Sequence, residues 1–249
     1  MRLLLKLKST KDQPYQEHHY QLQGFIYNLL KGSKFENIHD KEGYKFFCFS
    51  NIFPASDLKV RDIRHLIISS PNGHFIKHIA DRLEELMNSK RYITIGNMEF
   101  DIKMVKPFDI KLKMPVTLIT GTPIVIRIPR AKYERFNIKP KYPYKYLYWR
   151  QEYPLELFIE QFEDNLRKKY RAFSGRDANN ESIIEMLRFK KQVSTKIIMK
   201  DQEHTVIGTV WEFWFNDYTH KELLRFGIDS GFGERNSLGF GFMNVIKNE

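Results

Sequence analysis

The stretch GFGERNSLGFGF, residues 231–242, has a glycine spacing that suits the binding of an anion. Glycine costs backbone entropy, so it is favoured where φ is positive or where another group approaches the backbone closely. Successive backbone N–H groups in such a loop form a concave surface that can hold a phosphate. We therefore expect an anion to contact the glycines and the polar tip between them: Gly231, Gly233, Arg235, Asn236, Gly239 and Gly241. The rest of the chain must indicate that this anion is RNA.

The same spacing argues against a nucleotide cofactor. The dinucleotide fingerprint G-x-G-x-x-G needs a third glycine where this chain has Asn236. Only eight residues follow Gly241, too few for the helix and second strand of a βαβ unit. The phosphate-binding loop G-x-x-x-x-G-K-[ST] is also absent. We expect no cofactor.

Residues 127–150 combine cations with aromatic rings. Eight of these 24 residues are Lys or Arg, one is acidic and seven are aromatic. Cations bind phosphates and aromatic rings stack on unpaired bases, so the segment favours contact with single-stranded RNA. A solvated linker whose tyrosines cover the core is the alternative. The cations that we expect to contact RNA, here and on a predicted hairpin at 188–196, are Arg130, Lys132, Lys139, Lys141, Lys190 and Lys191.

The net charge and the cysteine count limit the classes of protein to which this chain can belong. A net charge of +11 over 249 residues favours a polyanionic partner. The single cysteine, Cys48, excludes an internal disulfide and zinc sites built on paired cysteines, and it suits a reducing cytoplasm. His74 and His78 share a helix face but lack the glutamate of the H-E-x-x-H motif, so we expect no metal site. No segment reaches the roughly 18 apolar residues of a membrane helix. We expect a cytoplasmic protein without a membrane partner.

The apolar patterns indicate two units with the same order of elements. Before about residue 110 the order is β-α-β-β-α-β, with strands at 2–8, 44–50 and 64–70, a strand or hairpin at 91–106, and helices at 20–32 and 74–89. After it the order repeats, with strands at 116–128, 186–200, 204–216 and 237–247 and helices at 155–173 and 219–227. Thr219 and Glu222 form a capping box at the start of the last helix.

This order predicts an α+β protein made of two tandem ferredoxin-like domains, 1–110 and 111–249, of the type used by RNA-recognition domains. Ferredoxin-like folds host many functions, so the fold alone does not identify one.

Both ends of the chain resemble one family. The stretch GFGERNSLGFGFMNV at the C-terminus resembles the glycine-rich signature of the CRISPR-associated endoribonucleases that cut repeat RNA, the sixth Cas family of the RAMP superfamily. The stretch YQLQGFIYNLL is similar to the first helix of that family. The resemblance implies that the protein binds CRISPR repeat RNA, precursor and processed, and cuts once within each repeat. It also implies a metal-independent reaction in which the 2′-hydroxyl attacks the adjacent phosphate, leaving a 2′,3′-cyclic phosphate and a 5′-hydroxyl.

The resemblance also implies catalytic residues. Family members with a catalytic triad have a tyrosine in the first helix, a histidine in the following loop and a lysine just before the next strand; the matching residues are Tyr27, His39 and Lys45. It implies that His39 is the general base or acid, that Tyr27 orients the hydroxyl or is the partner acid, and that Lys45 stabilises the phosphorane. Each also has an ordinary interpretation, as a half-buried tyrosine, a solvated histidine and a surface lysine. His18 and His19, just before the first helix, compete with His39.

Two other functions remain open. One is a non-cleaving RNA-binding scaffold of the same superfamily within a CRISPR effector complex; the set Tyr27, His39 and Lys45 favours the nuclease instead. The other is an unrelated RNA-binding module of the ferredoxin-like class, against which the C-terminal signature argues. The sequence does not decide between a monomer and a homodimer for any of these functions.

Overall fold

Alternating leucines make strand β1, Arg2–Ser9, the centre of the first sheet in the computed structural model. Leu3, Leu5 and Leu7 are fully buried, while the residues between them point to the other face. β1 pairs antiparallel with a strand on each side. The sheet has the order β2-β3-β1-β5-β4, with β2 at Cys48–Phe49, β3 at Ile63–Ser69, β4 at Ile93–Ile95 and β5 at Met98–Phe108.

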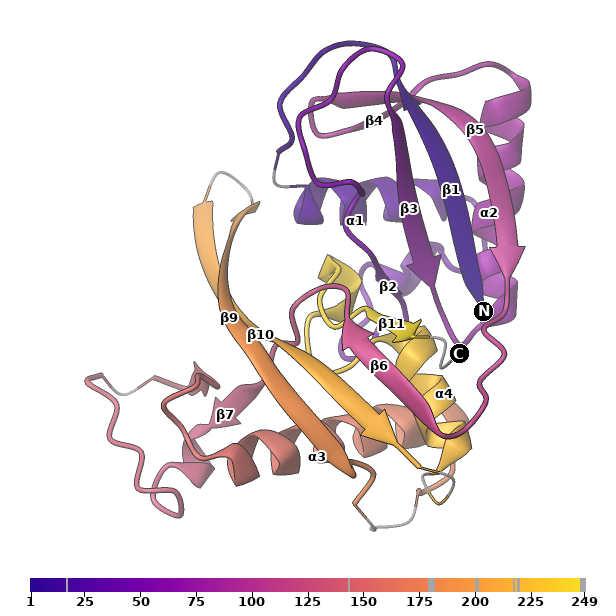
Figure 1. The fold of residues 1–249 in the computed structure, drawn as a ribbon. Coiled ribbons are helices and arrows are strands. Elements are labelled where there is room, and N and C mark those ends of the chain that lie inside the picture. Colours follow the sequence, from indigo (N-terminus) through magenta and orange to yellow (C-terminus); the bar gives the residue numbers. More distant parts are fainter. Residues whose placement is uncertain are drawn as a thin grey trace.

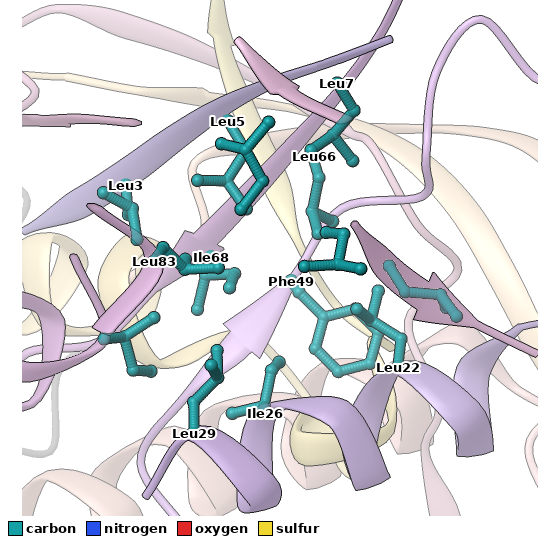
Figure 2. Close-up of a cluster of buried hydrophobic side chains, with 14 of the residues drawn as sticks. Leu3, Leu5, Leu7, Leu22, Ile26, Leu29, Phe49, Leu66, Ile68 and Leu83 are labelled. Atoms are coloured by element: carbon teal, nitrogen blue, oxygen red, sulfur yellow. The ribbon is translucent and has the colours of Figure 1, made fainter. Parts of the chain in front are cut away.

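Two helices pack on one face of this sheet. In α1, His19–Leu29, the residues Leu22, Ile26 and Leu29 recur at helical spacing and are buried against the leucines of β1 (Figure 2). In α2, Gly73–Asn88, an apolar stripe that includes Leu83 closes the same core. Asn72 caps the N-terminus of α2: its side chain accepts hydrogen bonds from the backbone N–H groups of His74 and Phe75.

The second sheet has the order β11-β6-β10-β9 and is also antiparallel. Phenylalanine and tryptophan side chains fill the core between this sheet and the helices α3 and α4. A two-stranded sheet, β7-β8, lies between β6 and α3 in sequence. The elements are β6 at Val116–Thr120, β7 at Arg127–Pro129, β8 at Tyr146–Tyr148, α3 at Leu155–Ser174, β9 at Met186–Met199, β10 at Gln202–Phe215, α4 at Lys221–Ser230 and β11 at Met243–Ile246.

The two sheets share one topology. In each, the first strand of the βαββαβ order lies between the third and the fourth strands, as β1 lies between β3 and β5 and β6 lies between β10 and β11. Residues 109–115 connect β5 to β6. The predicted α+β fold with two ferredoxin-like units is confirmed (Figure 1).

Several predicted strands are shorter than expected. The predicted strand 44–50 is reduced to β2. The predicted strand 116–128 is divided because β6 ends before the bend at 121–123, where proline has no N–H to donate. The predicted strand 237–247 is reduced to β11, since Gly239 and Gly241 adopt positive φ. Thr219 lies outside the described residues, and α4 is capped by the ring of His220, which accepts from Leu223 N.

The structure describes residues 1–16, 18–142, 144–178, 182–199, 202–216, 218 and 220–246. No helix in these ranges is long and apolar enough to span a membrane.

Contacts between the two units join β1 to α4 and β11, and join the β9–β10 hairpin to α1. The buried guanidinium of Arg2 donates to the carbonyls of Ile228 and Met243 at 3.0 and 2.7 Å. The β9–β10 hairpin reaches up beside α1 (Figure 1), where Ile197 and Val206 pack in a small cluster with Phe240 and, from α1, Tyr20. The segment that contains Leu238 and Phe240 is thereby held beside α1.

Candidate functional site

Helix α1 packs one stripe of side chains in the core of the first unit, and a second stripe remains accessible at the surface. Tyr27 follows buried Ile26, so its ring lies at the edge of the core, half-buried. The ring meets Phe47 edge-to-face on the core side, with centroids 5.9 Å apart. On the outer side it meets His39 in the same manner, with centroids 5.0 Å apart. The structure therefore brings two of the three predicted catalytic residues together.

His39 lies on an exposed loop, residues 36–45, which we call the His39 loop. A short 3₁₀ helix, Glu36–Ile38, ends at His39, whose side chain is 66% exposed. Its Nδ1 lies 2.7 Å from Oδ1 of Asp40, a contact that orients the imidazole. An exposed, oriented imidazole beside a phenol can exchange protons with a substrate.

Lys45 holds the His39 loop together. Its Nζ donates to the carbonyl oxygens of Ile38 at 2.8 Å and His39 at 3.0 Å, and also to that of Lys41. An ammonium has three donors, so these three carbonyls occupy all of them. Burial lowers the pKa of Lys45 below its usual value. The predicted role of Lys45 at the phosphorane would require its side chain to leave these carbonyls.

The C-terminal glycine-rich segment reaches the same site. We call residues 231–242 the glycine loop. Its Ser237 accepts a hydrogen bond from Gln23 of α1 at 3.1 Å and lies beside the Tyr27 phenol. Burial raises the pKa of Tyr27 above its usual value, and the neighbouring Ser237 hydroxyl opposes that rise. The phenol therefore stays protonated at neutral pH and can act as a donor.

A hollow of about 350 Å³ lies at this junction, and we call it the α1 hollow. Five of its lining residues lie on one face of α1, one lies in the turn just after the helix, and two come from the His39 loop. They are Tyr20, Gln23, Gly24, Tyr27, Asn28 and Lys31, together with Glu36 and His39. Lys45 does not line it.

The four glycines that we expected to contact RNA are surrounded by atoms of the protein itself. All four are buried and have positive φ. A Cβ at Gly239 would lie 2.3 Å from the Phe49 ring, and one at Gly233 would lie 2.5 Å from Val125 O. The half-exposed part of the glycine loop is the tip, residues 234–237. The glycines thus shape the loop, and the tip is the part that an RNA could touch.

A buried lysine that the sequence did not indicate as functional, Lys169, holds the glycine loop by hydrogen bonds. Lys169 of α3 is 2% exposed, and its Nζ donates to Gly231 O at 2.5 Å, Gly233 O at 3.0 Å and Asn236 Oδ1 at 2.9 Å. Burial lowers the pKa of Lys169 to about 7. The signal was present, because Lys169 follows Leu166 by three positions on the apolar face of α3.

A second hollow of about 540 Å³, the central groove, lies between the two units. Six cations and two carboxylates line it: Lys45, Arg127, Lys145, Lys168, Lys169 and Arg235, with Asp164 and Glu234. Asp164 pairs with Lys168 and Glu234 pairs with Arg127, so the groove keeps an excess of positive charge. Tyr44 and Tyr146 add aromatic rings to its lining. Phosphates with unstacked bases match this combination.

The other predicted RNA-binding cations are dispersed. Of the cations in the basic stretch 127–150, only Arg127 and Lys145 line the central groove. Lys132 pairs with Glu160 and Lys190 pairs with Glu212. The remaining predicted cations lie exposed elsewhere: Arg130, Lys139, Lys141 and Lys191.

The competing histidines are buried. His18 is 2% exposed, and its ring contacts Gln16 O at 2.9 Å through Nδ1. His19 is 8% exposed and stacks on Phe240 of the glycine loop, with centroids 5.1 Å apart. Of these three histidines, His39 is the one that a substrate can reach without rearrangement. Among the described residues no group of three or more His, Cys, Asp or Glu side chains could hold a metal ion.

Comparison with known proteins identifies the family. The family model described as "CRISPR associated protein Cas6, C-terminal" matches residues 106–245. A protein from Methanocaldococcus jannaschii named CRISPR-associated endoribonuclease Cas6 2 is 34% identical, over 99% of this chain and 100% of its own. CRISPR-associated endoribonuclease Cas6 of Haloferax mediterranei is 28% identical, over 99% of this chain and 94% of its own.

A solved structure titled "CRISPR associated protein Cas6" is 26% identical and superimposes with a TM-score of 0.72, covering 99% of each chain. The matches extend over both ferredoxin-like units. This chain therefore belongs to the Cas6 family of CRISPR-associated proteins.

Proposed function

We propose that this protein binds CRISPR repeat RNA and cuts precursor CRISPR RNA once within each repeat. Two relatives that match over nearly the whole chain are named CRISPR-associated endoribonucleases, which supports the proposal. The observation that carries it is the contact between Tyr27 and the exposed ring of His39 at the α1 hollow. Two groups that can carry protons lie there within reach of one substrate.

In the proposed reaction, the 2′-hydroxyl at the cut site attacks the neighbouring phosphorus. His39 takes the hydroxyl proton, and the bond from phosphorus to the 5′ oxygen breaks. That oxygen receives a proton, and the products are a 2′,3′-cyclic phosphate and a 5′-hydroxyl. Tyr27, protonated at neutral pH, supplies that second proton, and the imidazolium of His39 returns a proton to the phenolate. Proton transfer by side chains accounts for each step without a metal ion.

The remaining parts of the site would position the RNA. Lys45 keeps the carbonyls of the His39 loop in place, and so sets the position of the imidazole. The central groove offers cations to phosphates further along the strand. The tip of the glycine loop joins the two hollows, because Ser237 lines the groove and also contacts α1.

The test is cleavage of the host's own repeat RNA in EDTA. We expect the wild type to cut once, and a substrate with a 2′-deoxy nucleotide at the cut site to resist. His39→Ala should bind with unchanged Kd and cut roughly 10²–10⁴-fold more slowly, as expected for loss of a general acid or base. His74→Ala, an exposed histidine on α2 outside both hollows, is the matched control and should cut normally.

Other outcomes would change the assignment. If His39→Ala cuts at the wild-type rate, the proton carrier lies elsewhere. If the wild type binds the repeat tightly and never cuts it, the protein is a non-cleaving scaffold. If cleavage stops in EDTA and returns with Mg²⁺, the metal-independent mechanism is wrong.

A further inference from the structure

Gly24 is a glycine in the interior of a helix without a packing reason. A Cβ built there would have no side chain and no other segment of the described chain within 4 Å. Gly227 of α4 is different, since a Cβ there would lie 2.5 Å from Phe232 Cζ. Glycine is a poor helix former, and a glycine in a helix usually serves a packing or a functional purpose. Packing within the chain explains Gly227 and leaves Gly24 unexplained.

The position of Gly24 points to a substrate. Gly24 lies on the free stripe of α1, between Gln23 and Tyr27, and it lines the α1 hollow with His39. The missing side chain leaves the helix backbone accessible at the centre of this stripe. Glycine is the residue that lets another chain approach a backbone closely.

Lys31 provides the charge that such a substrate needs. It lies in the turn that follows α1, two residues after Leu29, the last residue of the helix. It is exposed and lines the α1 hollow, and its ammonium forms no ion pair or hydrogen bond with any described residue. The carboxylate in the same lining, Glu36, accepts from Gly32 N at 3.0 Å. The ammonium of Lys45 is occupied by three carbonyls, so Lys31 is the available cation of this hollow.

We propose that the stripe of α1 from Tyr20 to Asn28, together with Lys31 in the turn just beyond the helix, is a subsite for the ribose–phosphate backbone of the RNA beside the reacting nucleotide. Gly24 is the point of closest approach, and Lys31 binds a phosphate. The subsite rests on the proposed function in one respect, the identity of the ligand as RNA. Its size fits, because 350 Å³ lies within the range of pockets that hold small ligands.

The experiment measures binding of a non-cleavable probe, the host's repeat RNA with a 2′-deoxy nucleotide at the cut site. Gly24→Ala and Gly24→Leu replace glycine with strong helix formers, so neither variant should lower Tm. We expect Tm to rise by about 3 °C for Gly24→Ala. Filling the contact should weaken binding, with Kd raised about tenfold for alanine and more for leucine. Gly73→Ala, at the first residue of α2, is the control and should leave Kd unchanged.

Lys31→Met should reduce the slope of log Kd against log salt by about 0.7, the contribution of one phosphate contact on a single strand. Lys31→Arg should restore the slope. Lys77→Met, an exposed lysine on α2, removes the same charge elsewhere and should leave the slope unchanged.

The subsite is overturned if Gly24→Leu binds as tightly as the wild type, or if Lys31→Met keeps the full salt slope. A wild type that binds the probe but never cuts the all-ribose repeat disproves the proposed cleavage, while Kd still decides the subsite. A wild type that binds no repeat RNA overturns both.

Discussion

The glycine loop and the His39 loop meet at one site but are held in opposite ways. The glycine loop is largely buried, and its backbone donates to the rest of the unit, as Gly241 N does to Pro123 O at 2.9 Å. Lys169 binds its carbonyls from below. The His39 loop is mostly exposed, and one lysine side chain, that of Lys45, binds three of its carbonyls.

The difference indicates that the glycine loop supplies a rigid part of the site and the His39 loop an adaptable part. Local stability within a protein ranges from almost nothing in exposed loops to the full value in the core. The buried loop can keep Ser237 in a fixed place beside Tyr27, because moving it would break many contacts. The exposed loop can admit a substrate and adjust to it. A comparison of variants in the two loops tests this division, and stability is the first quantity to measure.

The largest loss of stability is expected for Gly241→Ala. A Cβ there would lie 1.9 Å from Phe232 O, and φ is +74°. Left-handed backbone costs an alanine about 1–2 kcal/mol, and overpacking costs about 1–3 kcal/mol more. We expect the free energy of unfolding to fall by about 4 kcal/mol in urea titrations.

The matched control in the other loop is Gly43→Ala. Gly43 has φ +86° and open space around it, so only the backbone cost of about 1–2 kcal/mol applies. Equal losses in the two variants would show that burial of the glycine loop contributes nothing to its stability.

A smaller loss, on the order of 3 kcal/mol, is expected for Lys169→Met, because its acceptors are left buried without donors. This contribution should depend on pH. The pKa of Lys169 is about 7 in the folded chain and 10.5 ordinarily, so between these values the unfolded chain binds more protons. The stabilising contribution of Lys169 therefore rises with pH in this window, by up to about 1.4 kcal/mol per pH unit.

The measurement for Lys169 is urea unfolding of the wild type and Lys169→Met at pH 7, 8 and 9. The difference between the two proteins should grow in favour of the wild type as pH rises. A difference that stays constant would mean that the buried ammonium keeps its proton throughout.

The smallest effect on stability is expected for His39→Ala. The side chain is 66% exposed and its polar partner, Asp40, is also exposed, so the free energy of unfolding should change by less than about 0.5 kcal/mol. The same variant should lose cleavage. If instead it unfolds as easily as Gly241→Ala, the His39 loop has a structural role, and the proposed contrast between the loops fails.

Much of the fold could be predicted because its signals are local. Leu22, Ile26 and Leu29 mark the buried face of α1 by their spacing alone, and the order of elements in each half gave the ferredoxin-like class. Predicted strand ends were less accurate. At the end of β6, proline chemistry and a close contact of Gly121 with Phe242 outweigh the strand propensity of the valines and isoleucines that follow.

The site was only partly predictable. The resemblance named Tyr27 and His39, and the structure brings their rings into contact. The spacing of the glycines indicated close approach to the backbone, and the groups that approach them here are protein side chains and carbonyls, such as Phe49 and Val125 O. Glycine permits either kind of neighbour, so spacing could not distinguish them.

By itself, the sequence determined the helices, most strands, the basic charge and the family resemblance, since these depend on residue type and on periods of two or 3.6 residues. Only the tertiary structure decided which residues form the site. Ser237 lies more than 200 positions from Tyr27, and Lys169 lies 62 positions from Gly231. Such contacts depend on how two separate cores pack together, and no local pattern in the chain records that.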